Sequence, residues 1–145
     1  MKLHWSPRSP FVRKVMIVAH ERGLAGRLQC VRTVAEMTKP HAELMKDNPL
    51  SKIPTLVLDD GTALYDSPVI CEYLDALDGS PKLFPRRGQA RFIALRRQAL
   101  GGALSYLDFR FAELDWRRQR PLLANWRVAF AERPSAQANL PVDDS

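Results

Sequence analysis

The sequence predicts a mixed α/β domain followed by a shorter all-α region. Two Ser-Pro pairs, Ser9-Pro10 and Ser67-Pro68, each open an apolar pattern with helical spacing. Strand-like runs lie between the two pairs. Beyond residue 88 the composition becomes helical. Together these observations indicate strands and helices in the first half and helices alone in the second.

The first predicted unit is a strand, a helix and a second strand. Residues 2–5 alternate as in a short strand, and residues 11–24 carry apolar side chains at helical spacing. Gly23 and Gly26 end that helix, and the β-branched content of residues 28–34 predicts the second strand. Such a β-α-β unit favours parallel strand pairing with a right-handed crossover.

The second predicted unit is a hairpin followed by a helix. Pro40 breaks any long helix after the second strand, so residues 42–46 form one or two turns at most. An Asp-Gly turn joins the apolar runs 55–58 and 62–65, which is a strong hairpin signal. Apolar residues at helical spacing then predict a helix over residues 68–77.

A linker containing Gly and Pro separates this part from the helical half. We expect a first domain over residues 1–78, the linker over 79–88 and a helical domain over 89–145. The predicted helices of the second half cover residues 89–100, 103–111 and 122–131. The tail from Pro134 is expected to be frayed.

The composition is that of a soluble globular protein of one or two small domains, with 145 residues, 46% hydrophobic and 26% charged. No apolar run approaches the ~20 residues of a membrane span, and the N-terminus lacks the apolar core of a signal peptide. We therefore expect a cytoplasmic protein with no membrane partner. Cys30 and Cys71 form no CxxC pair, and Cys30 is expected to be a small buried thiol. The three His residues lack metal-ligand spacing, so no metal is expected.

The positive charge is concentrated in the second half. Residues 1–85 carry 11 Lys and Arg against 10 Asp and Glu, a net charge of +1. Residues 86–145 carry 11 Arg against 6 acidic residues, a net charge of +5. This pattern indicates a solvated or partner-facing helix surface, and no nucleic-acid partner is expected because no aromatic interleaving or known motif accompanies it.

The two Ser-Pro pairs also suggest a binding site. Ser is a favoured N-cap and Pro a favoured first helical residue, so each pair presents a hydroxyl and free backbone N–H groups. A helix N-terminus attracts anions. Either pair alone is an ordinary cap, but two of them separated by the step Ile53-Pro54 suggest a pocket for a small ligand with two negative groups.

The predicted order of elements resembles the thioredoxin-like arrangement, as β-α-β-β-β-α or β-α-β-α-β-β-α. Four segments resemble the glutathione transferase family, in particular its serine-type, bacterial-like members. They follow the family's order and cover nearly all of residues 1–85: Ser6–Lys14, Asn48–Leu56, Asp60-Gly61 and Tyr65–Leu74. The similarity continues in Leu83–Pro85, Tyr106–Arg110 and the region of Trp126.

This resemblance implies a glutathione site at the matching residues. Ser9 matches the active-site Ser of serine-type members, whose hydroxyl would donate a hydrogen bond to the glutathione thiolate. Asp66 and Ser67 match the acidic-Ser pair that holds the γ-glutamyl end, with Ser67 for the carboxylate and Asp66 for the α-amino group. Family members more often have Glu at this position, so the shorter Asp66 is expected to weaken binding.

The resemblance also implies contacts to the rest of glutathione. Ile53-Pro54 matches the family's cis-Pro step, which would turn the Ile53 backbone toward the cysteinyl part of the ligand. Lys52 is placed to approach the glycyl carboxylate, with Lys39 and His41 as alternatives.

Several neighbouring residues complete the expected site. Phe11 directly follows Ser9-Pro10 and belongs to the expected glutathione-binding set. Trp5 and Tyr65 are expected in the core or the pocket wall. Ser6 is not expected to be catalytic, because Ser9 is the residue before Pro.

The second half departs from the family because it is too short for the usual helical bundle. Only 60 residues follow position 85, and five helices of ~11–12 residues would use them all. The similarity jumps between Leu100 and Ala103, so we expect a truncated all-α C-terminal domain. Three explanations stay open: a naturally shortened member, a deletion product that still folds, or a longer chain whose intervening residues are absent from this sequence.

The resemblance implies a glutathione transferase with glutathione as co-substrate and no metal. It would ionise the thiol at Ser9, conjugate it to a small electrophile and act as a homodimer. The alternative is a non-catalytic binding or regulatory protein of the same fold, which the shortened half and its Arg-rich surface favour. A thiol-disulfide enzyme is disfavoured because neither Cys occupies the position of Ser9.

Overall fold

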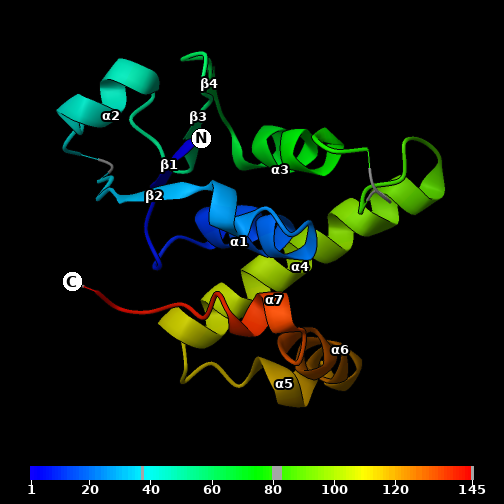
Figure 1. Ribbon diagram of the computed structural model, residues 1–145. Coiled ribbons are helices and arrows are strands. Elements are labelled where there is room, and N and C mark those ends of the chain that lie inside the picture. Colours follow the sequence, from blue (N-terminus) through cyan, green and yellow to red (C-terminus); the bar gives the residue numbers. More distant parts are fainter. Residues whose placement is uncertain (37, 80–82, 145) are drawn as a thin grey trace.

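The computed structural model describes residues 1–36, 38–79 and 83–144. Its centre is a four-stranded mixed sheet in the order β2-β1-β3-β4 (Figure 1). Strand β1 runs parallel to β2 and antiparallel to β3, and β4 completes the hairpin with β3. The strands are β1 Lys2–Trp5, β2 Gln29–Arg32, β3 Thr55–Val57 and β4 Ala63–Leu64.

Three helices and a short 3-10 turn accompany the sheet. Helices α1 and α3 pack against each other and on the sheet, whereas α2 lies on the other side of the strands (Figure 1). Their bounds are α1 Pro10–Glu21, η1 Ala25–Arg27, α2 Ala42–Asp47 and α3 Ser67–Ala76. The core between the helices and the sheet is built from Leu3, Val15, Val18, Ala19, Leu24, Leu28, Leu56, Ile70, Cys71, Leu74 and Phe84.

The observed order β-α-β-α-β-β-α is the second of the two predicted arrangements, and the thioredoxin-like fold is confirmed. The parallel pairing of the first two strands is confirmed as well. The first helix ends three residues before the predicted Leu24, close to Gly23, which adopts a φ of +68°. One side-chain expectation is wrong: Cys30 is exposed, because β2 is an edge strand.

A buried carboxylate secures the passage from the first half to the second. Asp75, near the end of α3, accepts hydrogen bonds from the backbone N–H groups of Leu83 at 2.8 Å and Phe84 at 2.9 Å. Arg22 pairs with the same carboxylate at 3.3 Å. Phe84 is thereby held in the core. The domain boundaries at residues 78 and 89 stay a prediction.

The second half begins with one long helix, α4 Gln89–Arg110, where two helices were predicted. The expected break at residues 100–103 is wrong, because Gly101 and Gly102 lie within this helix and permit close packing. A Cβ on Gly101 would overlap the Phe130 ring, and a Cβ on Gly102 would lie 3.1 Å from Lys14 Cγ. The glycine pair therefore brings α4 against α1 on one side and α6 on the other.

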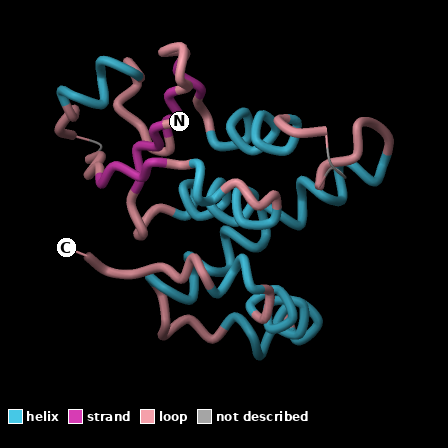
Figure 2. The backbone as a smooth tube through the Cα atoms, viewed as in Figure 1, coloured by secondary structure: helices cyan, strands magenta, loops and turns pink. Residues whose placement is uncertain are grey.

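The remaining helices form a small layer beside α4 (Figure 2). They are α5 Trp116–Gln119, α6 Pro121–Ala131 and α7 Pro134–Gln137. The expectation of a frayed tail from Pro134 is wrong, because α7 and the residues after it are attached to α1. The buried Arg13 donates hydrogen bonds to the carbonyl oxygens of Asn139 at 2.6 Å and Ala136 at 3.1 Å.

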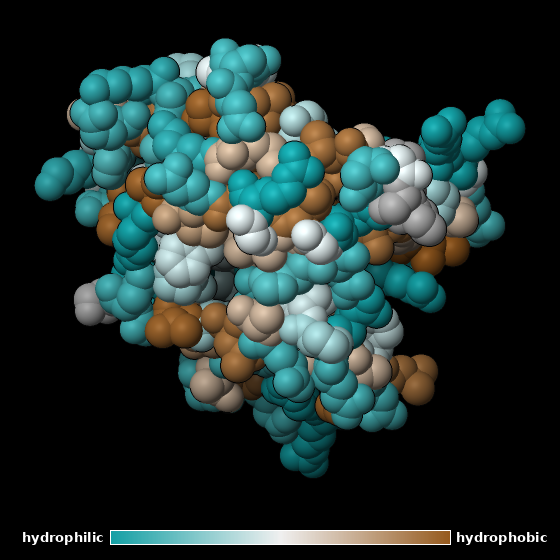
Figure 3. Space-filling view, viewed as in Figure 1, coloured by the Kyte–Doolittle hydropathy of each residue, from teal (hydrophilic) through white to brown (hydrophobic). Residues whose placement is uncertain are grey.

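The surface seen in Figure 3 is mainly hydrophilic, with apolar residues in separate patches. Among the helices within the described ranges, none combines the length and the apolar character that crossing a membrane requires.

Candidate functional site

Ser9 caps α1 at its N-terminus, as the sequence predicts. Its Oγ accepts a hydrogen bond from the backbone N–H of Val12 at 3.3 Å, and Pro10 begins the helix. A hydroxyl has one donor hydrogen and two acceptor positions, so Ser9 can still donate while it caps the helix. Ser9 is half-buried. The local geometry therefore presents a hydrogen-bond donor at the positive end of α1.

The start of α3 differs from the prediction by one residue. Asp66, and not Ser67, is the N-cap, and its carboxylate accepts a hydrogen bond from the Ser67 backbone N–H. Ser67 is the first helical residue and is only 1% exposed. Its Oγ has no hydrogen-bond partner within the described ranges. A buried hydroxyl without a partner costs roughly 1–3 kcal/mol, so this atom is suited to a ligand that supplies one.

The Ile53-Pro54 bond is cis, which confirms the prediction. The loop before it is organised by Asn48, whose side chain is fully buried. Its Nδ2 donates to the Lys52 carbonyl at 3.2 Å and to Thr55 Oγ1 at 2.9 Å. Sequence reasoning did not assign Asn48 a role, although Asn-Pro is a recognised turn-forming pair.

The three candidates for a glycyl carboxylate lie in different settings. Lys39 and Lys52 are exposed. His41 caps α2, since its Nδ1 accepts a hydrogen bond from the Leu44 N–H at 3.2 Å. Its own N–H donates to Ser51 Oγ at 2.9 Å, which ties the start of α2 to the loop before Ile53.

A buried polar cluster that the sequence did not reveal joins α2 to the sheet. His4 contacts Thr33 Oγ1 through Nδ1 at 3.0 Å and Asp47 Oδ2 through Nε2 at 2.7 Å. Lys2 Nζ lies 2.7 Å from the same Asp47 oxygen. The hydrogen bonds from Lys2 and His4 lower the pKa of the Asp47 carboxyl below its ordinary value. No local sequence pattern predicts this cluster, because its members are far apart in the chain.

The crevice beside Ser9 is very small. It is a cavity of about 10 Å³, which is roughly the space one water molecule needs. Its walls come from the loop after β1, the first turns of α1, the middle of α4 and the tail: Pro7, Arg8, Ser9, Pro10, Arg13, Gly102, Tyr106 and Pro141. The tail is held there by Asp143, which pairs with Arg8 at 3.3 Å and Arg110 at 3.9 Å.

Neither cysteine adds thiol chemistry to this region. Burial raises the pKa of the Cys71 thiol to about 12, and Cys30 lies on the edge strand β2. A search of the described residues finds no group of three or more His, Cys, Asp or Glu side chains that could hold a metal ion.

Comparison with known proteins identifies the fold's relatives. The family model described as glutathione S-transferase, N-terminal domain, matches residues 8–77. A solved glutathione transferase family member from Pseudomonas fluorescens Pf-5, with bound glutathione, superposes with a TM-score of 0.91 at 32% identity. The superposition covers 97% of this chain and 98% of that chain. The chain belongs to the glutathione transferase family.

Curated relatives match more than half of this family member. They include the uncharacterized GST-like protein YibF of Escherichia coli, 36% identical over 87 residues, which are 59% of this chain and 41% of YibF. Glutathione S-transferase 2 of Saccharomyces cerevisiae is 36% identical over 86 residues, which are 57% of this chain and 36% of that protein. A stringent starvation protein A homolog from Histophilus somni is 36% identical over 92 residues, 59% of this chain and 40% of that protein. The chain thus spans about two fifths of the length of these curated relatives.

Proposed function

We propose that this chain is a serine-type glutathione transferase that uses glutathione as co-substrate and transfers its thiolate to a small electrophile. The observation that carries the proposal is the Ser67 hydroxyl, which is buried at the start of α3 without a hydrogen-bond partner in the described ranges. The γ-glutamyl carboxylate of glutathione would supply the acceptor, and the solved relative from P. fluorescens carries bound glutathione.

The rest of the ligand is assigned by the matching residues. Asp66 takes the α-amino group, and the backbone of Ile53 beside Pro54 pairs with the cysteinyl part. Lys52 takes the glycyl carboxylate, with Lys39 and His41 as alternatives. Phe11 belongs to the same binding set and is exposed at the start of α1.

Ser9 supplies the chemistry in this proposal. Because its Oγ already accepts from Val12, the free hydroxyl hydrogen is the part available to the ligand sulfur. A charge-assisted hydrogen bond and the end of the helix together contribute ~2–4 kcal/mol to the thiolate. At 1.36 kcal/mol per unit this lowers a thiol pKa by roughly 1.5–3 units, enough to ionise it at neutral pH. No second catalytic residue is needed, because ionisation and positioning supply the rate.

The test separates chemistry from binding. Ser9→Ala is expected to keep its glutathione affinity and lose most turnover with an activated aryl chloride. The thiolate absorbance of the bound ligand should then appear at higher pH than in the unmodified protein. Ser67→Ala is expected to weaken glutathione binding by ~1–2 kcal/mol without moving that pH. Unchanged turnover in Ser9→Ala contradicts the role of Ser9.

A second candidate function is a non-catalytic binding or regulatory protein. The crevice at Ser9 favours it, since a free volume of about 10 Å³ holds no more than about one water molecule. A stringent starvation protein A homolog, whose name states no transferase activity, is among the similar proteins. Glutathione binding without turnover on any general electrophile, together with a partner captured independently of glutathione, would support it.

A cytoplasmic homodimer completes the proposal. Its basis is the resemblance to the glutathione transferase family. Sedimentation equilibrium of the purified chain gives the assembly mass directly, and a mass of 16.5 kDa at high concentration would contradict the dimer.

A further inference from the structure

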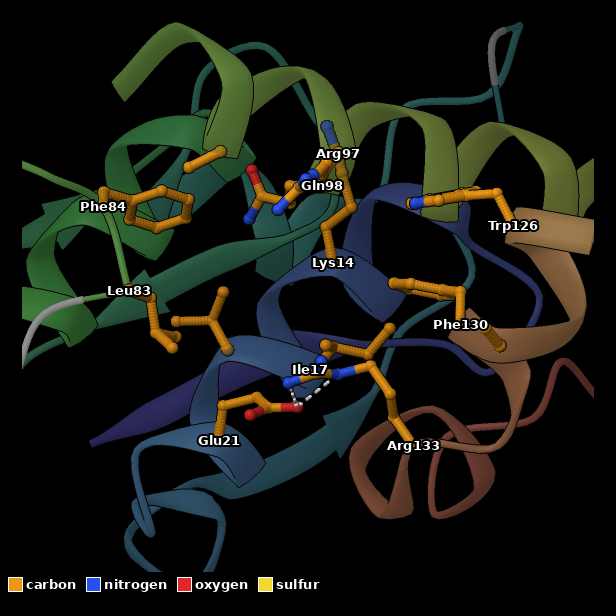
Figure 4. Close-up of a pocket in the computed structure, with 13 residues that line it drawn as sticks. Lys14, Ile17, Glu21, Leu83, Phe84, Arg97, Gln98, Trp126, Phe130 and Arg133 are labelled. Carbon is orange, nitrogen blue, oxygen red and sulfur yellow. Dashed lines mark hydrogen bonds and ion pairs between the residues drawn. The ribbon is translucent and has the colours of Figure 1, made fainter. Parts of the chain in front are cut away.

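A second cavity lies along the flank of α1, away from Ser9. It has a volume of about 360 Å³ and opens between α1, the segment around Phe84, α4 and α6 (Figure 4). This volume is at the lower end of the range for small-molecule sites. None of the residues assigned to the glutathione site lines it. The cavity is therefore separate from the site already described.

Much of the cavity wall is apolar and aromatic. Ile17 of α1 and Phe84 form one part of it. Trp126 and Phe130 of α6 form another, and their rings stack with centroids 5.3 Å apart at an interplanar angle of 22°. Figure 4 shows these two rings on the side of the cavity opposite Phe84. Such a wall is suited to a flat hydrocarbon group.

One side of the cavity carries positive charge that has no acidic partner. Figure 4 shows Lys14, Arg97 and Gln98 gathered there. Within the described ranges neither Lys14 nor Arg97 forms an ion pair, and the Lys14 Nζ lies over the face of the Phe11 ring, 5.2 Å from its centroid. The Gln98 side chain is directed to the buried Cys71 thiol, with which it forms a hydrogen bond. Two cationic groups, Lys14 and Arg97, thus lie on this side of the cavity without an acidic partner among the described residues.

The acidic residue of the cavity does not neutralise these donors. Glu21 lines the opposite end and is already bound by Arg133, whose Nη2 and Nε lie 2.7 and 2.9 Å from Glu21 Oε1. Ser135 Oγ donates to the same oxygen at 2.5 Å. The cavity therefore has a neutral end, an apolar wall and a cationic side.

We propose that this cavity binds a small aromatic carboxylate, with the carboxylate on Lys14 and Arg97 and the ring against Trp126 and Phe130. A carboxylate supplies several acceptor positions to the two cationic groups, and its bonds to Lys and Arg are charge-assisted. The flat ring replaces solvent at the stacked aromatic pair. This proposed site does not depend on glutathione turnover. A result that contradicts the proposed transferase function would therefore leave the proposed aromatic carboxylate site untouched.

The test uses 2-naphthoate as the probe and its neutral analogue 2-naphthylmethanol as the ligand control. Calorimetric titration of the full chain with 2-naphthoate is expected to give one site per chain, with affinity at least tenfold above that of the alcohol. Arg97→Met and Lys14→Met should each weaken the naphthoate by about fivefold to tenfold. Arg96→Met, the adjacent exposed Arg that does not line the cavity, is the matched control and should change nothing.

A cavity-filling variant tests whether naphthoate binds in this cavity. Ala129→Phe places a ring into the cavity from an exposed position on α6, so it should abolish naphthoate binding without lowering the unfolding temperature. Saturating glutathione should leave the naphthoate affinity unchanged. Equal affinity for the alcohol, an unaffected Arg97→Met variant, or competition by glutathione would each overturn the proposal. So would naphthoate binding that occurs only when two chains associate, seen as a doubled mass in sedimentation.

Discussion

The two halves of the chain hold together by different means. Of the fifteen buried apolar side chains among the described residues, thirteen lie in the first 84 residues, and only Leu104 and Ala136 lie beyond residue 88. Large apolar residues are exposed in both halves, and the most exposed of them are Phe92, at 69%, and Leu122, at 85%, in the second half. The first half therefore has a core of its own, whereas the second half depends on attachment to the first.

The tail of the second half is attached by polar groups of α1. Arg13 is buried and binds the carbonyl oxygens of Ala136 and Asn139. Burial, with the nearby Arg127, lowers the pKa of Arg13 to about 10, so this guanidinium stays charged at neutral pH. Glu21, at the end of the same helix, binds Arg133 and Ser135. The helix that carries the proposed catalytic Ser9 is thus also the support for the tail that closes over it.

The largest change in the free energy of unfolding is expected where a variant removes core packing in the first half. Leu56→Ala removes a fully buried side chain from β3 and should lower the free energy of unfolding by about 3–5 kcal/mol. Leu122→Ala, at the most exposed apolar position of α6, should change it by less than about 0.5 kcal/mol. Chemical denaturation measures the free energy of unfolding of both variants. Equal losses of unfolding free energy in Leu56→Ala and Leu122→Ala would contradict the distinction between the two halves.

The next largest loss of stability is expected from a variant that detaches the tail, residues 134–144, from α1. Arg13→Met removes two charged-donor hydrogen bonds and should cost about 2–3 kcal/mol. Hydrogen exchange should rise in residues 134–144 well before it rises in β1 and β3. Arg133→Met, at an exposed position, is the control and should cost about 1 kcal/mol or less. Uniform loss of protection across both halves would show that they unfold as one unit.

A smaller effect is expected at the glycine pair of α4. Gly101→Ala forces the Phe130 ring to move and should cost about 1–2 kcal/mol, even though Ala favours helices. Gly102→Ala meets the flexible Lys14 side chain and should stay within about 0.5 kcal/mol of the unmodified chain. Thermal unfolding of the two variants distinguishes these outcomes. A stabilised Gly101→Ala variant would contradict the close packing of α4 and α6.

The smallest expected change in stability comes from Glu21 and depends on pH. Partial burial would raise the pKa of Glu21, but hydrogen bonds from Ser135 and Arg133 outweigh it and lower the pKa below its ordinary value of 4.5. A lowered carboxyl pKa stabilises the fold above that value, and the stabilisation is lost as pH falls. Glu21→Gln should therefore cost up to about 1 kcal/mol at neutral pH and nothing in strong acid. A difference that grows on acidification would contradict the assigned interaction.

The contrast between the two halves of the chain also explains which features the sequence could predict. Local patterns located the strands, the hairpin and the helix starts of the first half, and resemblance located the cis Ile53-Pro54 step. The two helices predicted over residues 89–100 and 103–111 are one, because Gly101 and Gly102, although each costs a helix about 1 kcal/mol, permit the close approach of Phe130 and Lys14.

The site was only partly predictable for a related reason. Ser9 caps its helix as expected, but the cap of α3 moved to Asp66 because a short acidic side chain also accepts the first free N–H. The cluster of His4, Thr33 and Asp47 and the attachment of α7 through Arg13 join residues far apart in the chain. Only the folded arrangement brings such residues together.

The most direct test of glutathione binding at the two helix N-termini is a calorimetric titration of the purified chain with glutathione. We expect saturable binding with one site per chain, weakened about fivefold to thirtyfold in Ser67→Ala. The absence of a binding signal up to millimolar glutathione would contradict the account, and would leave a family fold without the family's ligand.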